Sequence, residues 1–143
     1  MVNRISPDPT QPGRFALEQE GQPAVSIRYN EATHSLRLQR ESEQRVYLIE
    51  RDRLSSGRLR LYSEYGLPSG TCHLDDPQAR RGTVKLDGHK FRFERHGDSI
   101  AISVDGKMTE HVSWQPAGES PEALAGIILL LCREAIAPLR VAT

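Results

Sequence analysis

The arginines between residues 51 and 60 form the densest group of basic side chains in this sequence. The segment reads Arg-Asp-Arg-Leu-Ser-Ser-Gly-Arg-Leu-Arg. If it folds as a hairpin, Arg58 and Arg60 project from one face, and Arg51 and Arg53 join them at the same end. Guanidinium groups make paired hydrogen bonds to phosphates and carboxylates. Four of them on a barrel rim could hold a lipid headgroup, a phosphate or an acidic partner.

The same segment has a simpler interpretation as a solvated face. Glu50, Asp52 and Glu64 would then act as counter-charges to the arginines. Of the 19 basic residues 16 are arginine, which fits either a GC-rich coding genome or selection for planar, bidentate contacts. Both interpretations of the segment stay open at this point.

The histidines do not show the spacing of a metal site. They stand singly, without the HxH, HxxxH or HExxH spacing that places two imidazoles on one ion; they are His34, His73, His89, His96 and His111. The best local cluster joins His73 to Asp75 and Asp76, but this segment is also typical of a turn. We therefore expect no metal and no other cofactor.

Nucleophilic catalysis finds no support in the sequence. There is no G-x-S-x-G motif and no glycine-rich phosphate loop. Cys132 lies in the most apolar stretch, where a thiol stays protonated. Cys72 is expected to be more accessible, yet its neighbour His73 would point to the opposite face of a strand. We expect two reduced thiols, no disulfide and no enzymatic activity.

Length and charge narrow the class of protein. A chain of 143 residues is the size of one globular domain. Nineteen basic and nineteen acidic residues give a formal net charge of zero, which argues against a dedicated nucleic-acid binder. Residues 1–10 carry no apolar run, so we expect neither a secretory signal nor a transmembrane segment, and a cytoplasmic protein.

Alternating apolar residues predict strands through most of the chain. Val25, Ile27 and Tyr29 share one face, for example. Residues 46–49 are apolar on both faces, which predicts a central strand covered on each side. Residues 1–13, with three prolines, are expected to form a flexible N-terminal arm, and residues 14–143 a single domain.

Two Asp-Gly pairs predict hairpins. Asp87-Gly88 suits a two-residue type I′ turn, which pairs Leu86 with His89, Lys85 with Lys90 and Val84 with Phe91. At Asp105-Gly106 a two-residue loop would put the apolar rows on opposite faces. There we predict a three-residue loop with a bulge, which restores a common face.

The end of the chain predicts a buried helix over residues 121–137. Ser120 is a good N-cap, Pro121 suits the first helical position, and Pro138 is expected to end the helix. Residues 123–132 are all Ala, Leu, Gly, Ile or Cys. Ten such residues rise about 15 Å, roughly half of a bilayer's hydrocarbon core, so a core helix is favoured over a membrane span.

A sheet can bury a helix on all sides only by curling around it. The fold class predicted is therefore mainly β (α+β): an antiparallel β-meander, curled into a closed or nearly closed barrel around a hydrophobic C-terminal helix. The alternative is an open twisted sheet with the helix on one face. The length predicts fewer than twelve strands, between eight and ten.

This pattern resembles the tubby-like superfamily, which includes tubby C-terminal domains, phospholipid scramblases and LURP-one-related proteins. The resemblance covers residues 15–139. The most similar segments are Glu64-Tyr65-Gly66, residues 82–88 and the helix from Leu124 to Cys132. It is closer to small bacterial proteins of this design than to tubby itself. It implies a β-barrel that encloses a C-terminal helix, and no functional residue is carried over from it.

Three functions fit these observations. The leading hypothesis is a non-enzymatic tubby-like binding module that contacts anionic lipid or phosphate through Arg51, Arg53, Arg58 and Arg60. The second is a protein-interaction or accessory module that docks through an edge strand or the N-terminal arm. The third is a small-molecule carrier or enzyme with a site at the barrel mouth. We place that site around Trp114, Tyr62 and Tyr65.

Overall fold

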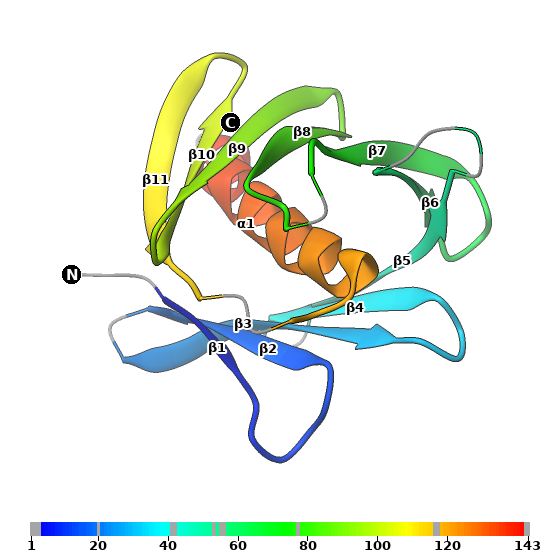
Figure 1. Cartoon of the computed structure of the whole chain (residues 1–143), viewed down its shortest axis with the longest axis horizontal. Coiled ribbons are helices and arrows are strands. Elements are labelled where there is room, and N and C mark those ends of the chain that lie inside the picture. The colour runs from blue at the N-terminus through cyan, green and yellow to red at the C-terminus, as the bar shows by residue number, and fades with distance from the viewer. Residues whose placement is uncertain are drawn as a thin grey trace.

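The chain forms a closed β-barrel around one helix (Figure 1). The computed structural model describes residues 4–19, 21–40, 43–52, 54, 57–76, 78–115 and 118–141, with the backbone alone for residues 108–110 and 136–141. The elements in chain order are β1 (Arg4–Pro7), β2 (Arg14–Gln19), β3 (Gln22–Asn30), β4 (Ser35–Arg40), β5 (Glu43–Arg51), β6 (Arg58–Ser63), β7 (Pro68–Leu74), β8 (Arg81–Leu86), β9 (His89–His96), β10 (Ser99–Val104), β11 (Lys107–Ser113) and α1 (Pro121–Val141).

Consecutive strands pair antiparallel from β1 to β11, as expected for a meander. With eleven strands the first and the last run in the same direction, so the barrel closes through a parallel pair, β1 with β11, in which Arg4 lies opposite Ser113. The predicted fold class is confirmed. The eleven strands lie below the predicted limit of twelve but above the range of eight to ten.

The extra strand comes from the expected N-terminal arm. Residues 4–7 do not stay outside the domain but form β1, which pairs with β2 from Arg4–Glu18 to Pro7–Phe15. Pro7 lies at the end of its strand, so its missing N–H does not interrupt the middle of the ladder. The expected division of the chain at residue 13 is therefore corrected, since the barrel begins at β1. Among the described strands none is left with a free edge.

Helix α1 fills the interior of the barrel. From Leu124 to Cys132 every residue is nearly or fully buried. At Gly126 a Cβ atom would lie 2.7 Å from Cδ2 of Leu36 and 3.1 Å from Cδ1 of Ile27. The glycine therefore allows the helix to approach β3 and β4 closely. The predicted burial of an all-apolar helix is confirmed.

The helix begins where the sequence predicts and continues further than expected. Ser120 caps it, because its hydroxyl accepts a hydrogen bond from the Ala123 N–H at 3.2 Å and its carbonyl accepts one from Leu124 at 2.9 Å. The prediction that Pro138 ends the helix is wrong, since the helical backbone runs to Val141. Proline removes one backbone hydrogen bond, but its φ value is compatible with a helix.

Polar contacts connect the C-terminal half of α1 to the barrel wall. Arg133 donates hydrogen bonds to the Tyr47 hydroxyl at 2.9 Å and to the Asp87 carboxylate at 2.8 Å. Arg40 of β4 forms an ion pair with Glu134. These contacts fix the depth to which the helix enters the barrel, which hydrophobic burial alone leaves loosely defined.

The two Asp-Gly hairpins differ in how well they were predicted. The pairs around Asp87-Gly88 are confirmed, and both turn residues have positive φ, 52° and 79°. The loop at Asp105-Gly106 also has two residues, with Val104 opposite Lys107, so the predicted three-residue loop is wrong. The bulge lies further along, between the Ser103–Met108 and Ile102–Glu110 pairs, and it places Val112 opposite Ile100 on the inner face.

Strand β5 is not covered on both sides. Tyr47 and Ile49 are buried against the interior, whereas Val46 and Leu48 are half-exposed on the outer face. The barrel is a single layer of sheet, so its outer face has no second layer to cover it. Outward apolar residues on this strand are therefore surface features.

Candidate anion-binding face

The outer wall of β6 to β9 carries a group of basic side chains that we call the cationic face. Its residues are Arg58, Arg60, Thr71, His73, Thr83, Lys85, Lys90 and Arg92. Along each of these strands the intervening residues Leu59, Cys72, Val84 and Phe91 are buried in the core. The members of the face therefore point outward, because successive side chains of a strand alternate between its two faces.

Strand register arranges these eight residues in two rows. One row follows the pairs Arg60–Thr71, Thr71–Lys85 and Lys85–Lys90. The other follows Arg58–His73, His73–Thr83 and Thr83–Arg92. Neighbouring strands lie about 4.8 Å apart and residues i and i+2 about 7 Å apart, so the face measures roughly 14 by 7 Å between Cα positions. Figure 1 shows β6, β7, β8 and β9 as adjacent strands of the wall.

No carboxylate lies between the cations of either row, but acidic residues border the rows: Glu50 of β5 stands directly opposite Arg60, and the Asp105 carboxylate accepts the Lys90 N–H at 3.0 Å. Arg60 Nη2 lies 3.3 Å from Asp52 Oδ2. Within the described part of the chain, no ion pair involves Arg58, Lys85, Lys90 or Arg92. Lys85 stands directly opposite Lys90, a like-charge arrangement that costs stability in a sheet. Such an arrangement suits a surface that binds an anion.

Exposed apolar side chains flank the cationic face at both ends of β6. Leu54, just before the strand, is 95% exposed, and Tyr65 and Leu67, just after it, are 83% and 64% exposed. They are the large hydrophobic residues that stand out as exposed among the described residues. A basic surface bordered by exposed apolar groups is typical of proteins that lie on a membrane interface.

The four arginines predicted from the sequence do not form one site. Arg58 and Arg60 lie together on the cationic face, whereas Arg53 lies outside the described residues. Arg51 follows the inward side of β5, and its Nε and Nη2 donate hydrogen bonds to the two carboxylate oxygens of Glu122, with Nη2 3.0 Å from Oε2. Arg51 therefore connects the barrel wall to the first turn of α1.

The ion pair between Arg51 and Glu122 is partly shielded from water. The Glu122 side chain is 11% exposed and that of Arg51 is 61% exposed. Burial acts to raise the pKa of Glu122, but the Arg51 hydrogen bonds and charge outweigh it and hold that pKa below its usual value. Burial and the neighbouring Glu122 and Glu31 carboxylates raise the pKa of Tyr29.

Glu122→Gln is expected to lower the free energy of unfolding by about 1 kcal/mol near neutral pH, since Arg51 is largely exposed. The pKa of Glu122 is lower in the folded state, so its stabilisation is complete above the unfolded value and is lost as the pH falls through the folded value. Urea unfolding of both proteins between about pH 7 and pH 3 measures the difference. It should shrink on acidification, and a difference that stays constant would contradict this role.

The other candidate residues take structural positions. Cys72, expected to be the more accessible thiol, is 1% exposed, and burial raises its pKa to about 12. Burial also raises the pKa of Cys132, and both cysteines are free. His73 Nδ1 lies 3.1 Å from Asp75 Oδ1, while Asp76 accepts backbone hydrogen bonds of its turn. Within the described residues, no group of three or more histidine, cysteine, aspartate or glutamate side chains could hold a metal ion.

The aromatic residues expected at a barrel mouth are not brought together. Trp114 is buried in the core, with the Arg95 guanidinium 5.9 Å from the centre of its ring. Tyr62 lies on the outer face of β6, and Tyr65 lies in the turn that follows. An open hollow of about 960 Å³ adjoins Tyr62, Leu48 and Glu122. The space inside the barrel, where a carrier would hold its ligand, is filled by α1.

Sequence reasoning identified Arg58 and Arg60 but did not connect them with Lys85, Lys90 and Arg92. One signal was present, because the hairpin register already placed Lys85 opposite Lys90 on the polar face. The missing information was strand β7 and its register, which places Arg60 and Lys85 on either side of Thr71 and Arg58 and Thr83 on either side of His73.

Comparisons with protein-family models, curated proteins and solved structures find no match to this chain. The resemblance to the tubby-like superfamily therefore stays a prediction. In the described residues, no helix has the length and apolar character needed to span a membrane.

Proposed function

We propose that this protein is a non-enzymatic, tubby-like barrel module that binds phosphate-bearing anionic surfaces through its cationic face. The observation that carries the proposal is the pair of rows on β6 to β9, which present five cations, with carboxylates at their margins, among them Glu50 opposite Arg60 and Asp75 beside His73. Arginine and lysine side chains near an anionic surface each contribute about 1 kcal/mol of binding. The barrel fixes the backbone that carries these cations, so binding has to order their side chains but not the chain itself.

Anionic lipid is the source of phosphate that the surroundings favour. Leu54 can enter the headgroup region beside Arg58, while the cations contact phosphates. Nucleic acid fits less well, because the two rows hold no Phe, Tyr or Trp side chain to stack on bases, and the His73 imidazole is paired with Asp75. The cytoplasmic leaflet, which carries anionic lipid, is the membrane surface that we propose for a cytoplasmic protein.

Flotation with vesicles of phosphatidylcholine alone, or mixed with phosphatidylserine, tests the proposal. The wild-type protein should float only with anionic vesicles and dissociate as salt is raised. Arg58→Gln, Lys85→Gln and Arg92→Gln combined should weaken binding by about 100-fold, from roughly 1 kcal/mol for each charge. Arg81→Gln is the matched control, because Arg81 stands opposite Glu94 on the neighbouring row.

Competition separates the sources of the anion. If inorganic pyrophosphate displaces the protein from vesicles at matched ionic strength, the face recognises phosphate groups themselves. If only salt displaces it, the face responds to surface charge. Equal flotation with neutral and anionic vesicles, or tighter binding to single-stranded RNA than to vesicles, would overturn the proposal.

A further inference from the structure

A second group of arginines lies on another part of the wall, across β2, β3 and β4. Arg14 stands opposite Arg28, and Arg28 stands opposite Arg37. Their neighbours along each strand, among them Phe15, Ile27 and Leu38, are buried in the core. All three arginines therefore point outward in one row, although they are far apart in the sequence. This row has no member in common with the cationic face.

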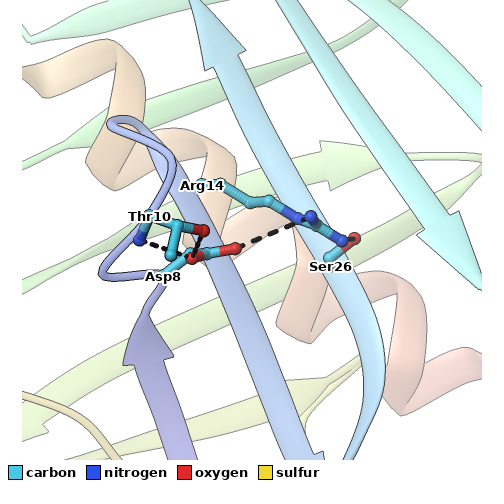
Figure 2. Close-up of polar contacts among 4 residues, drawn as sticks. All are labelled: Asp8, Thr10, Arg14 and Ser26. Carbon is cyan, nitrogen blue, oxygen red and sulfur yellow. Dashed lines mark hydrogen bonds and ion pairs between the residues drawn. The ribbon is translucent and has the colours of Figure 1, made fainter.

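Arg14 already has its partners. Its Nη1 lies 3.6 Å from Asp8 Oδ2, and its Nη2 lies 3.5 Å from the Ser26 hydroxyl. Figure 2 shows its guanidinium between these two groups, with Thr10 on the far side of Asp8. The Thr10 N–H and hydroxyl donate to Asp8 Oδ1 at 2.8 and 2.7 Å. Asp8 is thus occupied by Arg14 and Thr10, and it is not shared with Arg28.

Arg28 and Arg37 differ from Arg14 in this respect. In the described part of the chain, no ion pair connects either guanidinium to a carboxylate. Directly opposite residues in an antiparallel pair have Cβ atoms about 4.5–5.5 Å apart, and like charges placed there repel. The outward residues on either side of this pair are neutral hydrogen-bonding groups, Ser26 and Gln39 on one side and Asn30 and Ser35 on the other.

We propose that Arg28 and Arg37 form a binding site for a doubly charged tetrahedral oxyanion, a phosphoryl or sulfate group. Two guanidiniums at this spacing can each donate to different oxygens of one such group, which has more acceptor atoms than a carboxylate. The bound oxyanion would cancel the repulsion between the opposed arginines. This proposal is independent of the proposed function, because it concerns other strands and a single small anion.

Thermal unfolding with inorganic phosphate, at constant ionic strength set with sodium chloride, tests the site. The variants are Arg28→Gln and Arg37→Gln, made in the Arg58→Gln, Lys85→Gln, Arg92→Gln background, which removes three of the five cations of the cationic face. Phosphate should raise the Tm of the background protein, since a ligand that binds the folded state stabilises it. Each added substitution should weaken phosphate binding by about tenfold.

The same experiment distinguishes a binding site from a chance arrangement. Without phosphate, Arg28→Gln or Arg37→Gln should raise the Tm, because the like-charge repulsion disappears, while Arg81→Gln should not. If phosphate raises the Tm equally in all variants, or does not raise it in the background protein, the proposal is wrong. Phosphate-induced shifts of β3 and β4 amide resonances provide a second readout, and their absence would also overturn it.

Discussion

Aspartate substitutions at four successive helix positions are each expected to prevent the chain from folding. The positions are Ile127, Ile128, Leu129 and Leu130, each at most 1% exposed. Successive residues of a helix differ by about 100° around its axis, so four of them sample every direction. A helix on the face of an open sheet would leave one of these positions in water, where aspartate is tolerated.

The expected size of the effect follows from charge burial. An unpaired buried carboxylate costs several kcal/mol after relaxation, a large share of the roughly 5–15 kcal/mol that stabilises a typical domain. Circular dichroism and amide spectra should show loss of the native fold in all four variants. Leu54→Asp is the control, because that side chain is almost fully exposed and should change the Tm little. A helix variant with near-native Tm would contradict the enclosed helix.

Gly82→Ala is expected to be the most damaging single-methyl change in the barrel wall. A Cβ atom at Gly82 would lie 2.1 Å from the His73 carbonyl oxygen and 2.5 Å from Cζ of Phe93. The carbonyl belongs to the paired strand β7 and the ring is buried, so neither can move without disturbing the sheet or the core. Overpacking of this kind costs about 1–3 kcal/mol, which lowers the Tm by several degrees for a chain of this size.

Gly88→Asn separates this clash from the general effect of replacing a glycine. Gly88 has a φ of 79°, and a Cβ atom there would meet nothing within 4 Å. Asparagine tolerates this conformation, so the Tm should fall only slightly. Thermal unfolding monitored by circular dichroism compares the two variants. An equal or larger loss at Gly88 would show that the contacts of Gly82 are not what limits the substitution.

Local chemistry in the sequence was enough for several parts of the structure. Asp87-Gly88 determined a turn and its register, because few residues other than glycine and asparagine or aspartate accept two successive positive φ values. Ser120 and Pro121 determined where the helix begins. The run from residue 123 to 132 determined that the helix is enclosed, because no polar side chain is available for a face in water.

The features that the sequence did not predict depend on contacts between segments that are far apart along the chain. Nothing local indicates that Arg4–Pro7 closes the barrel against β11, since that pair joins segments over a hundred residues apart. The bulge in β11 lies beyond the turn rather than in it, and in this position it directs Val112 toward the core. Pro138 did not end the helix, because a proline's local cost does not by itself decide where a helix stops.

The sequence by itself determined which side chains alternate, where the chain turns and that a helix is buried, because these depend on residues close together along the chain. The tertiary structure alone decided which charges meet. It directed Arg51 to Glu122 and away from Arg58. It placed Lys85 and Arg92 on the same outer face as Arg58, and it placed Arg28 opposite Arg37. Charge interactions depend on distance in space, and strand order, which is a property of the whole barrel, sets that distance.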